Sequence, residues 1–126
     1  MFEATQFARI PVSLPLLDLV KARIGSEKTL EDTNLLWVTH LFGTVYPMAR
    51  AFRERGLLAK DAIVVSSPYG ANPLVKTLFA DEGFDVRASR LDSKAYRNAV
   101  KKAIDDMLVK YRHNNKRIIV VDDGGL

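Results

Sequence analysis

The fold is decided by the stretch RIIVVDDGG at residues 117–125. Its four consecutive β-branched residues form an apolar run that is too short for a helix and typical of a strand covered on both faces. Two carboxylates and two glycines follow at once. The strand is therefore predicted to run directly into a polar, sharply turning loop.

Similar short apolar runs recur upstream and alternate with segments of helical spacing. The predicted strands are 35–39, 62–66, 84–88 and 117–121. The predicted helices begin with caps at Thr44, at Asn72 and at either Asp92 or Ser93, and they end at Gly56, Gly83 and 113–115. Strands that alternate with helices in this way imply right-handed βαβ units and a parallel sheet. The predicted class is α/β: an open parallel sheet of about four strands with flanking helices, of Rossmann or flavodoxin type.

Residues 1–33 follow a different pattern. A helix is predicted from Leu14 to Ile24, with Gly25 ending it. We expect 1–33 to form a helical segment packed on the domain or on a partner, and 34–126 to form a ligand-binding βαβ domain. A length of 126 residues fits one domain. Because the sequence stops inside the predicted loop, we expect the domain to be truncated at its C-terminus.

Composition narrows the function classes. The absence of Cys excludes disulfides, Cys-ligated metals and thiolate nucleophiles, and no apolar run is long enough to span a bilayer. A cytoplasmic protein without a membrane partner or a metal site is expected. The net charge of +4 owes much to basic residues between Lys94 and Arg117. These are interpreted as the solvated side of a helix paired with Asp105 and Asp106, not as a nucleic-acid surface.

That same long helix carries an apolar stripe. Its predicted core-facing residues are Tyr96, Val100, Ile104, Met107, Leu108 and Tyr111.

The candidate site lies where the strands end, because ligands of open α/β sheets bind outside the carboxyl ends of the strands. His40 directly follows the first strand and can bond a ligand or move a proton. The alternative is a loop histidine bonded to a backbone carbonyl. Asp122 and Asp123 point to opposite sides of the backbone, so one of them can face the crevice as a base or as an acceptor of a sugar hydroxyl. The alternative for this pair is a structural turn before the glycines.

Residues 67–73, SPYGANP, follow the second strand and are predicted to be a loop, and the polar groups at this place lie in 66–72, SSPYGAN. This segment can present hydroxyls, an amide and a helix N-terminus to a ligand, or it can be no more than a well-capped turn. The sequence has neither a Walker A motif nor a Gly-x-Gly-x-x-Gly fingerprint. Residues that bind a cofactor are therefore not identified.

Taken in order, these loops resemble the N-terminal part of the substrate-binding domain of S-adenosylhomocysteine hydrolase. The counterparts are VTH at 38–40, Gly56, SSPY at 66–69, GFDV at 83–86 and VVDDGGL at 120–126, so the resemblance covers about residues 30–126. Several positions differ from the family pattern. Phe42 and Val45 replace threonines, Gly70 and Ala71 replace a Ser-Thr pair, Asn72 replaces a glutamine, and Leu126 follows Gly125 where the family has an acidic residue.

The resemblance implies a nucleoside-type ligand and a hydrolase of thioether bonds. It assigns His40 and Asp123 to the ribose and to catalysis. Further substrate-binding candidates are Asn72, Thr44, Ser67, Asp122 and Gly124. It also implies NAD, which carries the redox step in that family and would bind outside this segment.

Two function classes remain open at this point. One is the ligand-binding part of such an NAD-dependent enzyme, in which case the 126 residues alone are expected to be inactive. The other is a non-catalytic α/β module that binds a small molecule or a protein. Assembly into a homo-oligomer is also left open.

Overall fold

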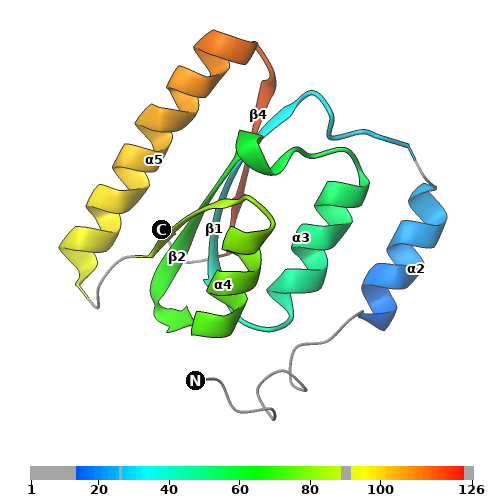
Figure 1. Cartoon of the computed structure of the whole chain (residues 1–126), viewed down its shortest axis with the longest axis horizontal. Helices are drawn as coiled ribbons and strands as arrows, with labels where there is room; N and C mark the ends of the chain where they lie inside the picture. The colour runs from blue at the N-terminus through cyan, green and yellow to red at the C-terminus, as the bar shows by residue number, and fades with distance from the viewer. Residues whose placement is uncertain (1–13, 26, 89–91, 124–126) are drawn as a thin grey trace.

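The computed structural model describes residues 14–25, 27–88 and 92–123, and in this part of the chain it forms an open parallel sheet flanked by helices (Figure 1). The strands are β1 (Thr33–Leu41), β2 (Ala62–Ala71), β3 (Asp85–Ala88) and β4 (Arg117–Asp122). The helices are α2 (Pro15–Ile24), α3 (Val45–Glu54), the short 3₁₀ turn Ala59–Asp61, α4 (Pro73–Asp81) and α5 (Ser93–Asn114). The predicted α/β class is confirmed.

The strand order is β3-β2-β1-β4, so β1 lies at the centre of the described sheet. Trp37 in β1 aligns with Val64 on one side and with Val121 on the other. The chain therefore proceeds outward from β1 to β3, crosses back through α5, and adds β4 on the opposite side of β1. The order of strands reverses next to β1.

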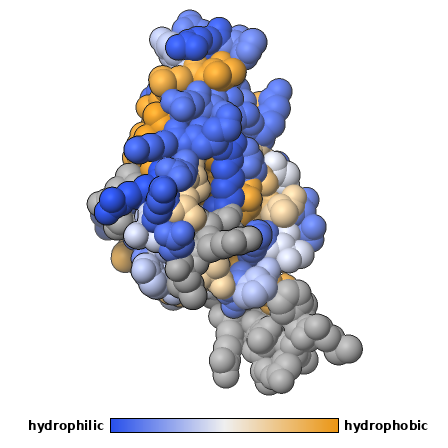
Figure 2. All heavy atoms as spheres, turned by 90° about the vertical axis from the view of Figure 1, so that its left-hand side faces the viewer, coloured by the Kyte–Doolittle hydropathy of each residue, from blue (hydrophilic) through white to orange (hydrophobic). Residues whose placement is uncertain are grey.

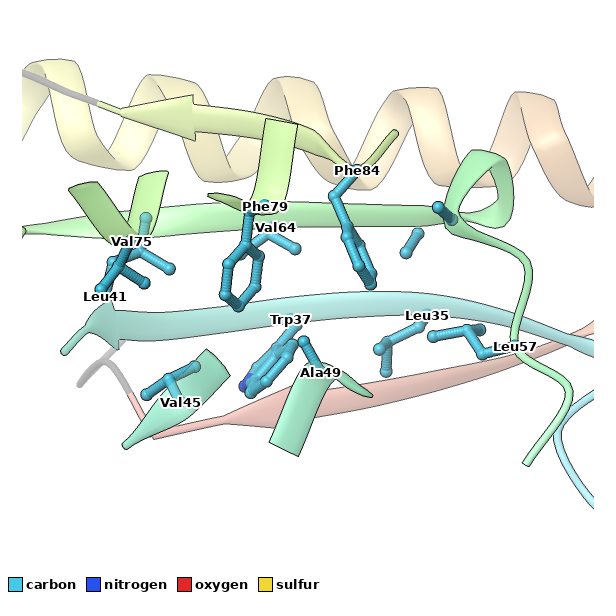
Figure 3. Close-up of a cluster of buried hydrophobic side chains, with 12 residues drawn as sticks. Leu35, Trp37, Leu41, Val45, Ala49, Leu57, Val64, Val75, Phe79 and Phe84 are labelled. Atoms are coloured by element: carbon cyan, nitrogen blue, oxygen red, sulfur yellow. The ribbon is translucent and has the colours of Figure 1, made fainter. Parts of the chain in front are cut away.

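Helices cover both faces of the sheet. On one face, α3 and α4 pack over a core centred on the fully buried Trp37, whose ring lies 5.2 Å from Phe52 and 6.0 Å from Phe79 (Figure 3). On the other face, α5 alone packs over β1 and β2. Its contribution to that core consists of Tyr96, Val100, Ala103 and Met107 against Leu36, Val38, Ile63 and Val65.

Most predicted helix boundaries are confirmed by their caps. The Asn72 side chain accepts a hydrogen bond from the Leu74 N–H at 2.9 Å, and Asp92 accepts one from Lys94 at 2.8 Å. Gly56 has a φ of 96°, the left-handed value expected after a helix end.

Thr44 lies at the predicted N-cap position of α3, but its side chain does not cap the helix. Its φ of −67° and ψ of −20° are helical, and its hydroxyl makes no capping bond. An N-cap residue needs extended backbone angles for its side chain to reach the free N–H groups, which helical angles do not allow.

The prediction of a loop over 67–73 is confirmed only in part. Strand β2 continues to Ala71, which aligns with Leu41 of β1 after a register shift between Thr39 and Leu41. The Asn72 N–H then donates to the Leu41 carbonyl at 2.9 Å. At this irregularity the four residues 67–70 lie opposite His40 alone, so they leave the regular register before the ladder resumes at Ala71.

Part of the predicted apolar stripe of α5 is not buried. Ile104, Leu108 and Tyr111 are each 43% exposed. Their side of the helix faces the edge strand β4, where an apolar groove of about 250 Å³ lies between Ile104, Leu108, Ile118 and Val120. Figure 2 shows hydrophobic surface beside the hydrophilic outer side of α5, in the upper half of the view.

Polar side chains join the elements at the amino end of the sheet. Asn34, which is fully buried, exchanges two side-chain hydrogen bonds with Asn114 at 2.9 and 2.7 Å. The Lys116 ammonium lies 2.6 Å from the Asp61 carboxylate. Arg117 donates to the Thr33 hydroxyl at 3.0 Å. These bonds connect β1, the 3₁₀ turn, α5 and β4.

Charged contacts also tie down the outer helices. Helix α2 has no buried residue and meets the end of α3 through polar contacts, among them a Lys21–Glu54 ion pair at 2.8 Å. On α5, Asp106 pairs with Lys102 at 2.8 Å and with Arg87 of β3 at 2.6 Å. These neighbouring cations hold the pKa of the Asp106 carboxyl below its usual value. The pairing of basic residues with Asp106 is confirmed.

Candidate functional site

The reversal of strand order next to β1 defines the candidate site. In open parallel sheets, a crevice forms outside the carboxyl ends of two neighbouring strands whose connections leave in different directions. Here those strands are β1, which leads outward to β2, and β4, which is reached by the crossover through α5. This switch point is bounded by His40 on β1 and by Asp122 and Asp123 at the end of β4.

A backbone hydrogen bond fixes the two strand ends against each other. Asp122 aligns with Val38, and the Asp123 N–H donates to the Val38 carbonyl at 3.0 Å. His40 is two residues further along β1, a rise of about 7 Å. The structure therefore brings His40 and the two aspartates to neighbouring positions at one edge of the sheet.

Strand alternation separates the two aspartates. Side chains two residues apart along a strand share a face, so Val38 and His40 lie on the α5 face, and so does Asp122 in register with Val38. The next residue, Asp123, takes the opposite side, where α3 begins. Each face of the switch point thus has one carboxylate, and His40 shares a face with Asp122.

His40 is partly exposed, and its ring stacks on Phe42, with ring centroids 5.5 Å apart and planes 11° from parallel. Its Nδ1 atom is buried and has no hydrogen-bond partner among the described residues. That nitrogen is therefore not bonded to a described backbone carbonyl, which was the alternative interpretation. Phe42 is 52% exposed and presents a flat apolar surface next to the imidazole.

The remaining candidates are spread more widely. Ser67 is buried, and its Oγ accepts a hydrogen bond from the Tyr69 N–H at 3.4 Å. The Asn72 side-chain oxygen is engaged in capping α4, which agrees with the interpretation of a capped turn. Thr44 is exposed in the segment after β1. Gly124 lies outside the described residues.

Sequence reasoning missed one polar group near this site. Tyr96, in the first turn of α5, is 8% exposed, and its hydroxyl is buried with no hydrogen-bond partner among the described residues. Burial raises the pKa of this hydroxyl, and the negative charge of Asp122 raises it further. The sequence did contain a signal for this group, because Tyr96 has a polar hydroxyl and lies in the apolar stripe of α5, in the turn next to the carboxyl edge.

The residues at the carboxyl edge of the sheet determine whether the candidate site can hold a metal ion or a dinucleotide cofactor. Within the described ranges, no three His, Asp or Glu side chains are arranged to bind a metal ion. The turn after β1 contains one glycine, Gly43, whereas a dinucleotide-binding turn needs three for its tight bend and for close approach of the pyrophosphate. The described turn therefore does not fit NAD.

The fold and the switch point define an open parallel α/β domain of the Rossmann or flavodoxin type. The chain was compared with protein-family models, curated proteins and solved structures, and no significant match was found in any of the three comparisons. In the part of the chain that the structure describes, no helix is long and apolar enough to cross a membrane.

Proposed function

We propose that this domain binds a nucleoside-type small molecule in the crevice between the carboxyl ends of β1 and β4. The observation that supports this most is the Asp123–Val38 hydrogen bond, because it holds the two aspartates beside the strand end that carries His40 and Phe42. Carboxylates and an exposed aromatic ring thereby meet at one place.

The chemistry of these groups matches the two halves of a nucleoside. Carboxylate oxygens accept hydrogen bonds from the vicinal hydroxyls of a ribose. The exposed Phe42 ring, stacked on His40, offers a flat apolar surface for a base. His40 adds an imidazole whose nitrogens can form a hydrogen bond to the ligand.

The proposal can be extended to the hydrolysis of a thioether bond, as in the S-adenosylhomocysteine hydrolase family. Only the sequence resemblance supports this extension. In such a reaction, Asp123 and His40 would orient the ribose and exchange protons with it. No step is assigned here to NAD, since the turn after β1 does not fit a dinucleotide. Binding without turnover is the expected behaviour of the 126-residue chain.

Calorimetric titration with adenosine tests the proposed binding. Asp123→Asn and His40→Ala should each weaken adenosine binding about 10–100-fold, because a charged acceptor or a donor to the ligand is lost. Asp105→Asn removes the same charge from the exposed side of α5 and should leave the affinity unchanged. Wild-type protein that does not bind adenosine at millimolar concentration would contradict the proposal.

A non-catalytic binding module is the second candidate. Phe42, Gly70 and Ala71 favour it, because they supply no hydroxyl where the related enzymes have threonine or serine. The protein as its whole gene encodes it separates the two candidates. Cleavage of S-adenosylhomocysteine by that protein supports the enzyme, and ligand binding without cleavage supports the module.

A further inference from the structure

Tyr96 is the one buried residue of α5 that has a polar side-chain group. The other three, Val100, Ala103 and Met107, are apolar and pack on the sheet. The Tyr96 ring lies in the same cluster, against β1 and β2, but its hydroxyl is buried with no hydrogen-bond partner among the described residues. A buried hydroxyl without an acceptor is unfavourable, and a phenylalanine would fill the same space without that cost.

The position of Tyr96 brings this hydroxyl to the switch point. Tyr96 belongs to the first turn of α5, which starts at the carboxyl edge of the sheet. The ring packs in one cluster with Val38, and Asp122 is the residue of β4 in register with Val38, on the same face. Burial raises the pKa of the Tyr96 hydroxyl and the negative charge of Asp122 raises it further, which agrees with this arrangement.

The other end of α5 differs in this respect. Asn114, in the last turn of the helix, exchanges two hydrogen bonds with the buried Asn34. At the amino edge of the sheet, the polar group of α5 is the Asn114 amide, and the chain supplies its partner. At the carboxyl edge it is the Tyr96 hydroxyl, which has no hydrogen-bond partner among the described residues. The unpartnered group lies where a ligand is proposed to bind.

We propose that the Tyr96 hydroxyl and the Asp122 carboxylate together bind one hydroxyl group of the ligand. The Tyr96 hydroxyl donates to the oxygen of that group, and the Asp122 carboxylate, which has several acceptor positions, accepts its proton. This inference rests on the proposed function and narrows it to ligands that carry an alcohol on the α5 side of the crevice. His40 lies on the same face and borders the same position.

A conservative variant tests the binding role. Tyr96→Phe keeps the ring and removes only the hydroxyl, so adenosine affinity should fall about 10-fold by calorimetry. Tyr111→Phe makes the same change near the far end of α5, at an exposed position, and should bind as the wild type does. With 2′-deoxyadenosine and 3′-deoxyadenosine, the effect of Tyr96→Phe should disappear for the analogue that lacks the bound hydroxyl.

Unfolding of the free protein provides a readout that does not depend on the ligand. If the hydroxyl has no partner inside the protein, Tyr96→Phe should unfold at the same urea concentration as the wild type or at a higher one. A lower midpoint would show an internal hydrogen bond and overturn the proposal. Equal adenosine binding by wild type and Tyr96→Phe would overturn it while leaving the proposed function intact. A wild type that binds none of the three nucleosides would overturn both.

Discussion

Two glycines with nearly equal backbone angles lie in different surroundings. Gly56, after α3, has a φ of 96°, and Gly83, after α4, has a φ of 95°. A Cβ atom added at Gly56 would lie 2.5 Å from Cγ of Glu31 and 3.2 Å from its backbone nitrogen. At Gly83 the nearest described atom, Cβ of Ala59, is 3.6 Å away, which is ordinary contact. Backbone strain is thus common to both positions, and crowding is specific to Gly56.

This difference predicts unequal costs for the same substitution. Gly83→Ala should lower the free energy of unfolding by about 1–2 kcal/mol, because alanine disfavours positive φ. Gly56→Ala should cost about 1 kcal/mol more, since the segment around Glu31 must also move. Urea unfolding of the two variants and the wild type measures both values. Equal losses of unfolding free energy in the two variants would contradict this expectation, because they would show that the segment before β1 moves without an energetic cost.

The helices show which local signals could be read from the sequence. Asn72 and Asp92 were predicted caps and form capping bonds, and the apolar runs predicted all four described strands. Thr44 had the right residue type but helical backbone angles, which depend on how β1 leads into α3. The extension of β2 past Ser66 depends on pairing with β1, a contact that no local pattern encodes.

The same distinction explains which residues of the candidate site could be predicted from the sequence and which could not. His40 and Asp122 could be placed because each directly follows an apolar strand, and parallel strands end at one edge. Tyr96 fits the apolar period of α5, so its spacing alone indicates core. Only the position of the helix over β1 and β2 shows that its hydroxyl is buried beside Asp122.

Asn72 and Thr44 provide a matched test, because both were expected to cap a helix and only Asn72 forms the capping bond. Asn72→Ala removes the acceptor of the Leu74 N–H and should lower the free energy of unfolding by about 1 kcal/mol. Thr44→Ala removes a hydroxyl that makes no capping bond and should change it by less than about 0.5 kcal/mol. Thermal and urea unfolding give both values. A larger loss for Thr44→Ala than for Asn72→Ala would contradict the assignment.

Across the whole molecule, the two edges of the sheet differ in how their polar groups are satisfied. At the amino edge, Asn34, Asn114, Asp61 and Lys116 bond to one another. At the carboxyl edge, His40 Nδ1 and the Tyr96 hydroxyl are buried without described partners. The amino edge therefore holds the elements together, and the carboxyl edge, where we propose that a ligand binds, has two buried polar atoms without a described partner.

This division predicts that stability and binding respond to different edges. Asn114→Ala leaves the buried Asn34 amide short of partners and should lower the free energy of unfolding by about 1–3 kcal/mol. Its adenosine affinity, measured on folded protein, should match that of the wild type. His40→Ala should show the reverse, with weaker binding and a change in stability below about 1 kcal/mol. Parallel losses of both properties in either variant would contradict this division.

The central position of β1 also determines when the site can exist during folding. Strands β1 and β2 are close in the sequence, whereas β4 pairs with β1 across a separation of about 84 residues, from Thr33 to Arg117. Such distant pairings close long loops and form slowly. Until β4 joins, His40 has no aspartate beside it. The described sheet is thus completed by its last strand to emerge in synthesis, and under the proposed function a ligand that bridges β1 and β4 would report on the finished sheet and on no earlier stage.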